Sequence, residues 1–201
     1  MTLLDLCSYL GLGAAGAAAL NLLLGMLISM RYSPVRSWPH RRINVFALHR
    51  WTAWLTILLT LTHPLVLLFI GTPRFRIFDI LLPIQSPLQP WINMAGAAAL
   101  YLLVLVFVTS LLRARMGRPL WRKLHYLVFP AAVLLFLHSI LTDPELKDGH
   151  PDLLDGGKVF LEIAALVCLL AIALRLRLRG NGLRGAAVHS TAPARQNSLE
   201  G

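Results

Sequence analysis

The chain has 201 residues, of which 57% are hydrophobic and only 14% are charged, and its formal net charge is +10. A water-soluble domain of this length would have to bury more apolar surface than its volume allows, so the composition favours a membrane protein. The positive charge lies in short segments between apolar stretches, which is typical of membrane topology signals, and we therefore expect no nucleic-acid partner.

Five apolar segments are each close to the ~20 residues that a helix needs to cross the hydrocarbon core of a bilayer. They cover residues 9–30, 45–70, 91–112, 120–141 and 159–174, and the last is the shortest. A spanning segment must satisfy its own backbone polar groups in lipid. The sequence therefore predicts an all-α membrane protein with a bundle of about five transmembrane helices.

The first span contains the small-residue run GAAGAAAL and Asn21. No basic segment precedes it, so we expect a retained helix and not a cleaved signal peptide. Its glycines, like Gly96 in the third span, are expected to let neighbouring helices approach, and Asn21 to hydrogen-bond within the bundle. Cys7 and Cys168 lie near opposite ends of the chain, so we expect no disulfide between them.

The second and fourth spans each contain two histidines, which are His49 and His63 in the second and His125 and His138 in the fourth. An ionisable group inside a membrane span is costly and is by default a candidate functional residue. The other three histidines, His40, His150 and His189, lie in connecting segments or the tail, where a solvated surface position explains them.

The spacing within each span places one histidine near each face of the membrane. The separations are fourteen and thirteen residues, or roughly 20 Å along a helix axis. In an ideal helix the thirteen-residue spacing leaves the two side chains about 140° apart. Pro130 lies between His125 and His138 and is expected to kink or rewind the helix, and Pro64 to bend the second span.

Residues 72–90 contain Arg74, Arg76 and several prolines among apolar side chains, which predicts an interfacial lid and not a sixth span. The two arginines are candidates to hold an anionic acceptor or another anionic group on the outer side. Anchoring at lipid headgroups is the alternative. The later acidic stretch DPELKDGHPDLLDGGK could attract a cationic metal or a basic partner. A solvated hydrophilic loop explains the same stretch equally well.

Basic residues gather in alternate connecting segments. The segment before and into the second span contains Arg31, Arg36, Arg41, Arg42 and Arg50, the next contains Arg113, Arg115, Arg118, Arg122 and Lys123, and the C-terminal one contains Arg175, Arg177, Arg179, Arg184 and Arg195. The opposite segments contain nearly all the acids. The positive-inside rule then predicts an N-terminus outside, a cytoplasmic C-terminus and a multi-pass protein of the inner (plasma) membrane.

With this topology the second and fourth spans run parallel, so His49 lies level with His125 and His63 level with His138. Two neutral imidazoles that face each other in an apolar bundle match the axial positions of a six-coordinate haem iron. No carboxylate or thiol stands beside them to complete a zinc or copper site. We therefore predict two haem b groups with these four histidines as axial ligands.

Arg50, Arg122 and Lys123 flank the predicted inner pair and are candidates to neutralise haem propionates. Simple positive-inside charge explains these three equally well. At the outer pair, Arg74 and Arg76 are the candidates to hold the propionates of the outer haem. We expect one haem-binding transmembrane domain over residues 1–178 and a short, basic, disordered tail over 179–201. The last residues, NSLEG, resemble a remnant of cloning.

The stretches LHRWTAWLTILLTLTHPLVLL and WRKLHYLVFPAAVLLFLHSIL resemble the ferric reductase-like transmembrane domain, over roughly residues 10–175. This domain is shared by ferric reductases, NADPH oxidases and the haem subunit of bacterial methionine sulfoxide reductase. In the ferric reductase and oxidase branch, two histidines on each of two helices bind two stacked haems, and the resemblance implies that role for the four histidines here. The methionine sulfoxide reductase branch typically lacks the first histidine of the HR dipeptide, so His49 favours the two-haem branch. Cytochromes b of quinol and ascorbate chemistry use similar spacings.

We therefore expect a di-haem b-type cytochrome, an oxidoreductase component that moves electrons from a cytoplasmic donor to an outer acceptor such as Fe(III), oxygen or a protein. Larger family members continue into a flavin and nicotinamide module, and no such motif follows Arg175. The donor is then expected to be a separate flavoprotein, or quinol. Two alternatives stay open, a quinol-linked haem subunit that feeds a periplasmic reductase and a non-redox membrane scaffold in which the histidines only pack.

Overall fold

The computed structural model describes residues 2–30, 44–143 and 152–190, and these are almost entirely helical with no strand among them. Five helical stretches are long and apolar enough to cross a membrane. They are Leu3–Ser29, Val45–Phe69, Pro90–Leu111, Arg118–Leu141 and Gly156–Leu178. The all-α class and the five predicted spans are thereby confirmed, with boundaries that differ by a few residues.

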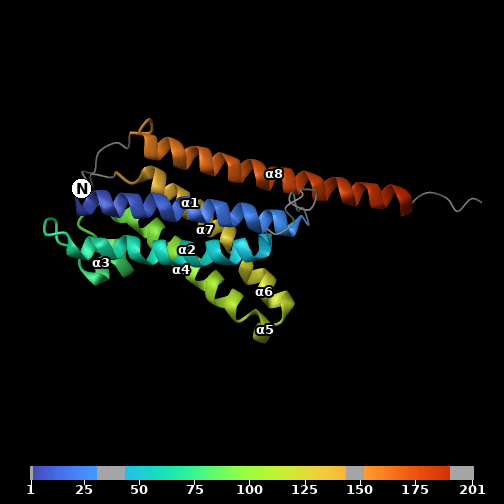
Figure 1. The fold of residues 1–201 in the computed structure, drawn as a ribbon, viewed down its shortest axis with the longest axis horizontal. Helices are drawn as coiled ribbons and strands as arrows, with labels where there is room; N and C mark the ends of the chain where they lie inside the picture. The colour runs from blue at the N-terminus through green and yellow to red at the C-terminus, as the bar shows by residue number, and fades with distance from the viewer. Residues whose placement is uncertain (1, 31–43, 144–151, 191–201) are drawn as a thin grey trace, which may run out of the picture.

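The long helices form an elongated bundle (Figure 1). They are α1 (Leu3–Ser29), α2 (Val45–Leu65), α4 (Pro90–Leu111), α7 (Val128–Leu141) and α8 (Gly156–Ser190). Helix α1 packs against α2 on one side and α8 on the other, while α4 packs along α7. Helix α8 extends past the rest of the bundle at one end (Figure 1).

The C-terminal tail differs in part from its predicted form, because α8 continues to Ser190 and not to about residue 178. No proline occurs between Gly156 and Pro193, and the intervening sequence is rich in leucine, alanine and arginine, which favour helix. His40 and His150, which were predicted to lie at the surface, are outside the described residues, as are residues 191–201.

Small side chains allow the helices to pack closely at the centre of the bundle. Ala15, Ala99 and Ala131 have no exposed surface. Ala15 of α1 and Ala99 of α4 belong to one buried cluster with Leu135 of α7 and Leu161 of α8. The expected close packing at small residues is therefore confirmed for these alanines. Among the described residues both cysteines, Cys7 and Cys168, are free and buried, as predicted.

Many large apolar side chains of the long helices point outward. Trp51, Leu58 and Leu170 are among those that expose more than half of their surface, whereas between 11% and 33% of the residues in each spanning window are buried inside the bundle. An exposed apolar belt of this kind suits a hydrocarbon surround and not water. The molecule is a multi-pass membrane protein.

The fourth span is interrupted between its two histidines. Helix α6 (Arg118–His125) ends at His125, and α7 begins three residues later at Val128. Pro130 has no backbone N–H for the carbonyl of Tyr126, and its ring clashes with that carbonyl in a continuous helix. The predicted break near Pro130 is thus present, and it lies between His125 and His138. Likewise α2 tightens after Pro64 into a 3-10 helix, η2 (Val66–Phe69).

The segment between η2 and α4 contains only short helical turns, α3 (Ile77–Leu81) and η3 (Pro83–Gln85), so no sixth spanning helix lies among the described residues. Phe78, Leu82 and Ile84 of this segment, the predicted lid, are well exposed.

At the other end of α4, the short helix α5 (Arg113–Met116) joins α4 to α6 through Gly117, whose φ of +76° favours glycine.

Candidate haem-binding site

The four intramembrane histidines form two pairs. His49 of α2 faces His125 of α6 with ring centroids 6.5 Å apart and planes at 78°. His63 of α2 faces His138 of α7 with ring centroids 6.4 Å apart and planes at 70°. The predicted pairing by level is therefore what the structure contains. The two pairs are called the inner pair (His49 and His125) and the outer pair (His63 and His138), after their predicted sides of the membrane.

Each histidine has a polar group at its Nδ1 atom. The backbone carbonyl of Cys7 lies 2.8 Å from Nδ1 of His63, that of Ile92 lies 2.9 Å from His138, and that of Asn21 lies 3.0 Å from His49. The partner of His125 is the hydroxyl of Ser110, at 3.3 Å. A carbonyl oxygen can only accept a hydrogen bond, so the Nδ1 atom that faces it must bear the hydrogen, and three of the rings have the tautomer protonated at Nδ1. Their Nε2 atoms then have a free lone pair.

Glycines make room for these hydrogen bonds. Gly11, Gly25 and Gly96 each come four residues after the carbonyl that accepts from a histidine, and in a helix the side chain at that position lies over that carbonyl. A Cβ atom on Gly11 or Gly96 would lie 2.9 Å from Cε1 of His63 or His138. On Gly25 it would lie 3.2 Å from Cε1 of His49. Three of the four rings therefore sit where a side chain would otherwise be.

Helix α1 supports both histidines of α2 through the same spacing. Cys7 and Asn21 are fourteen residues apart, as are His49 and His63, and the two helices run antiparallel. The side chain of Asn21 also donates to the carbonyl of His49 at 2.6 Å and to the hydroxyl of Thr52 at 2.7 Å. The predicted hydrogen-bonding role of Asn21 in the bundle is confirmed.

The inner pair has an aromatic neighbour. The ring of Trp121 stacks on His125 with a centroid distance of 5.0 Å and an interplanar angle of 29°. Its indole N–H donates to the hydroxyl of Ser110 at 3.5 Å, so Trp121 and His125 share this partner. Three basic residues are close in sequence to the inner pair: Arg50 follows His49, and Arg122 and Lys123 precede His125. All three side chains are exposed.

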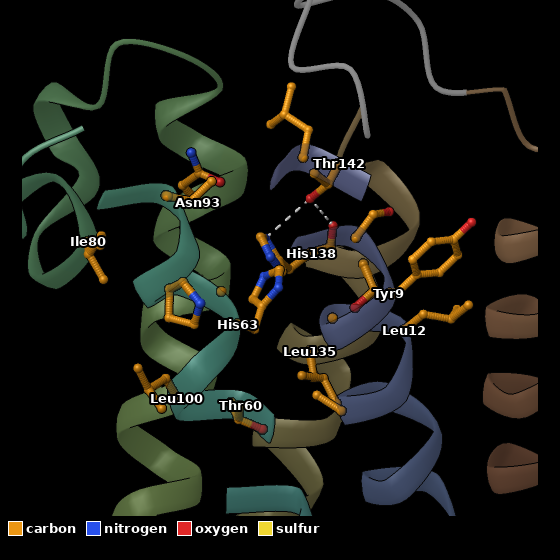
Figure 2. A pocket seen from close by; sticks show the side chains of 18 of the residues that line it. Tyr9, Leu12, Thr60, His63, Ile80, Asn93, Leu100, Leu135, His138 and Thr142 are labelled. Carbon is orange, nitrogen blue, oxygen red and sulfur yellow. Dashed lines mark hydrogen bonds between the residues drawn. The ribbon is translucent and has the colours of Figure 1, made fainter. Parts of the chain in front are cut away.

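The outer pair lines a cavity of about 890 Å³ (Figure 2). His63 and His138 point toward one another from opposite walls, with Thr60, Leu100 and Leu135 below them. Polar groups from the ends of the helices line the same space; they are Thr2, Asp5, Ser8, Asp79, Ser86, Asn93, Ser139, Thr142, Asp155 and Lys158. The cavity is therefore apolar at depth and polar towards its outer end.

These residues fit a haem. An iron between two imidazoles, with metal–nitrogen bonds of about 2.0 Å, places the ring centroids about 6 Å apart. The observed separations are 6.5 and 6.4 Å. A cavity of about 890 Å³ lies within the usual range for cofactor sites. The described residues contain no cluster of three or more metal-ligating side chains, so each pair needs a group such as a porphyrin to complete a metal's coordination.

The predicted outer arginines do not enter this cavity. Arg74 and Arg76 are exposed and are absent from its walls, whereas Phe75 between them is 4% exposed and lines it. The lid reaches the cavity through Phe75, Asp79, Ile80, Pro83 and Ser86. The structure therefore brings the four histidines together in pairs but does not bring the two arginines to the outer pair.

The model of the ferric reductase like transmembrane component matches residues 14–136, which is more than half of the chain. The chain belongs to this family. Domains of this kind are generally haem-binding, and membership indicates a transmembrane electron-transfer component. The matched region contains His49, His63 and His125 and ends just before His138. Comparison with curated proteins and with solved structures gave no match.

Sequence reasoning missed several residues of the site. It treated the glycines as helix-packing positions and did not single out Gly25, and it placed Lys158 in a solvated loop. It also overlooked Thr52, Thr56 and Thr60, which form a buried stripe along α2 between the two histidines. The repeat of four residues in this stripe, and the shared spacing of Gly11 and Gly25, are signals that the sequence contains.

Proposed function

We propose that this chain is a di-haem b-type cytochrome that carries electrons across the membrane, with His49 and His125 as axial ligands of an inner haem and His63 and His138 as those of an outer haem. The observation that carries the proposal is the geometry of the two pairs, with ring centroids 6.5 and 6.4 Å apart and a hydrogen-bond partner at every Nδ1 atom. Haem iron supplies one-electron redox chemistry.

The protein contributes the tautomer and orientation of the ligands. A metal-ligating histidine usually donates its second ring N–H to a carbonyl or similar acceptor, which fixes the ring and makes it a better ligand. The carbonyls of Cys7, Asn21 and Ile92 do this for three rings, and Ser110 lies where it can do so for His125. The pairs are thus supported in the form that iron binds.

Two levels suit transport across a bilayer. His49 and His63 are fourteen residues apart, or about 21 Å along α2, in a hydrocarbon core about 30 Å thick. The threonine stripe between them donates its hydroxyls to carbonyls of its own helix; Thr56 bonds to Thr52 and Thr60 to Thr56. These two hydroxyls therefore have hydrogen-bond partners within α2, so their burial between the two levels leaves no unsatisfied donor.

We further propose that the donor is a cytoplasmic flavoprotein, or quinol, and that the acceptor is on the outer side and is Fe(III), oxygen or a periplasmic redox protein. Support comes from the charge pattern, because exposed basic side chains such as Arg50, Arg122 and Lys123 surround the inner end and fit an anionic donor surface or haem propionates. The carboxylates of Asp5, Asp79 and Asp155 line the outer cavity and fit a cationic acceptor.

The test is haem stoichiometry in the purified, detergent-solubilised protein. Reduced-minus-oxidised spectra and a pyridine haemochrome assay measure the type and number of haems per chain. Two low-spin b haems per chain support the proposal. One haem per chain would favour the quinol-linked alternative, and a protein without a Soret band after haem-supplemented expression would favour the scaffold.

A further inference from the structure

Lys158 is a buried cation beside the outer pair. It lies in the first turn of α8, its side chain is 5% exposed, and it lines the same cavity as His63 and His138. Among the described residues that line this cavity, it is the only lysine or arginine. A buried lysine is rare unless its charge is compensated or used.

The ammonium group of Lys158 caps the end of α7. Its Nζ atom donates to the backbone carbonyls of Ser139 and Ile140, each at 2.8 Å, and to that of Thr142. The last carbonyls of a helix have no partner within the helix, so a cation at this end is favourable. An ammonium group has three N–H donors, and all three are used here.

The turn that Lys158 holds is the one that presents His138. Thr142 follows that histidine by one turn, and its backbone N–H and hydroxyl donate to the carbonyl of His138 at 2.9 and 2.5 Å. The same hydroxyl lies 3.4 Å from Nδ1 of His138, as Figure 2 shows. Movement of the α7 end would therefore move the ring of His138.

The hydrogen bonds of the Lys158 ammonium group go to neutral carbonyls, so a full positive charge lies at the cavity wall with three carboxylates nearby. Three carbonyls are neutral, and the carboxylate of Asp155, on the same cavity, is exposed and already accepts from the backbone N–H of Gly157 at 3.0 Å. Glu162, one turn further along α8, is half-buried, and Asp143 is the third carboxylate that interacts with the lysine. Asp155 is exposed, and water screens an exposed carboxylate more strongly than a charge enclosed at the cavity wall.

We propose that Lys158 is a positioning residue for the outer haem, which holds the turn of α7 that presents His138 and supplies a fixed positive charge that raises the reduction potential of that haem. The inference rests on the proposed function, because it needs a haem between His63 and His138. Reduction adds one electron to the site, and a nearby cation stabilises the form with one positive charge fewer.

The experiment is redox potentiometry of the purified holoprotein, with optical and EPR spectra recorded for both haems. Lys158→Met removes the charge and the hydrogen bonds, Lys158→Gln removes the charge but retains two N–H donors, and Lys158→Arg keeps the charge. Arg177→Met is the matched control, because it removes one exposed charge from the same helix about 28 Å further along.

We expect Lys158→Gln to shift the reduction equilibrium of the outer haem toward Fe(III) by about tenfold, or about 59 mV for one electron. We expect a shift at least as large in Lys158→Met, and less than a twofold change in Lys158→Arg and Arg177→Met. The inner haem should keep its potential in all four variants, since its ligands lie on the other level.

An outer haem with an unshifted potential in both Lys158→Gln and Lys158→Met would overturn the proposal. Loss of the outer haem in Lys158→Arg as well as in Lys158→Gln would also overturn it, because the lysine would then serve folding alone. Both outcomes differ from failure of the proposed function, in which the wild-type protein itself would lack the outer haem.

Discussion

The outer and inner histidine pairs have nearly the same ring separation, 6.4 and 6.5 Å, but different surroundings. Both outer rings have a backbone carbonyl at Nδ1 and a glycine beside them, and they line a cavity that also contains a buried lysine. In the inner pair only His49 has the carbonyl and the glycine. His125 has the hydroxyl of Ser110 and the stacked ring of Trp121 instead.

This difference indicates that the ligand type and the environment are set by separate parts of the chain. Helices α2, α6 and α7 present the imidazoles, whereas α1 and α4 supply the groups that orient them. Two bis-histidine sites can then have the same ligands and different reduction potentials, because hydrogen bonding and nearby charge tune a haem as well as its axial ligands do.

The largest effect is expected from removal of a ligand. His63→Ala or His138→Ala should leave one haem per chain with the spectrum of the inner site, because loss of one axial ligand leaves the outer iron five-coordinate and weakly held. His49→Ala or His125→Ala should leave the outer haem alone. Low-temperature difference spectra of the four variants measure this, and spectra that grouped by helix and not by level would contradict the pairing.

A methyl group on the glycine beside His138 should also weaken haem binding at the outer site. Gly96→Ala places a Cβ atom 2.9 Å from Cε1 of that ring, and overpacking of this kind costs about 1–3 kcal/mol, where 1.4 kcal/mol is about tenfold in affinity. We expect haem affinity at the outer site to fall by about 5- to 150-fold, as measured by haem titration of the apoprotein, while the inner haem is retained.

Gly13→Ala is the control for this glycine effect. A Cβ atom on Gly13 would lie 3.5 Å from Cδ1 of Leu59, which is ordinary van der Waals contact. Equal loss of haem in Gly13→Ala and Gly96→Ala would show that helix packing in general, and not room for the histidine ring, explains the result. Gly25→Ala, with a contact of 3.2 Å to His49, should weaken the inner site by less.

A smaller effect is expected from the hydroxyl that faces His125. Loss of such a hydrogen bond usually lowers metal affinity by about 10–100-fold, and the distance of 3.3 Å between Ser110 Oγ and Nδ1 of His125 places Ser110→Ala near the lower limit. We expect the inner haem to dissociate about tenfold more readily in a competition assay with apomyoglobin. Thr109→Val is the control, since this hydroxyl donates to the carbonyls of Leu105 and Val106 in its own helix.

The smallest effect is expected from the lid arginines. Arg74 and Arg76 are exposed and lie outside the walls of the outer cavity. The double variant Arg74→Ala/Arg76→Ala should keep both haems and the outer potential. Its rate of reoxidation by Fe(III) chelates, measured by stopped flow after chemical reduction, should fall by less than threefold. A larger loss would assign the two arginines to an acceptor site on the surface of the lid.

The spans and the pairing by level could be predicted from the sequence, because both depend on local properties. Hydropathy over ~20 residues marks a membrane helix, and the positions of four histidines along two parallel spans determine which of them lie level. The break near Pro130 was also predictable, since proline removes a specific backbone hydrogen bond. These features need no knowledge of how the helices pack around one another.

The groups that orient the histidines could not be predicted in this way. The acceptors at Cys7, Asn21 and Ile92 are backbone carbonyls, so the residue types at these positions do not reveal them. Lys158 comes from an acidic stretch that a solvated loop explains, but it is buried where its ammonium group donates to carbonyls at the end of α7. Arg74 and Arg76 have the charge for a propionate site, but the chain turns Phe75 inward between them.

The most direct test of the pairing is haem stoichiometry in two double variants that remove the same number of ligands. His63→Ala/His138→Ala removes both ligands of one level, whereas His49→Ala/His63→Ala removes one ligand from each level on the same helix. The account predicts one haem per chain in the first variant and none in the second. One haem in the second variant and none in the first would contradict it.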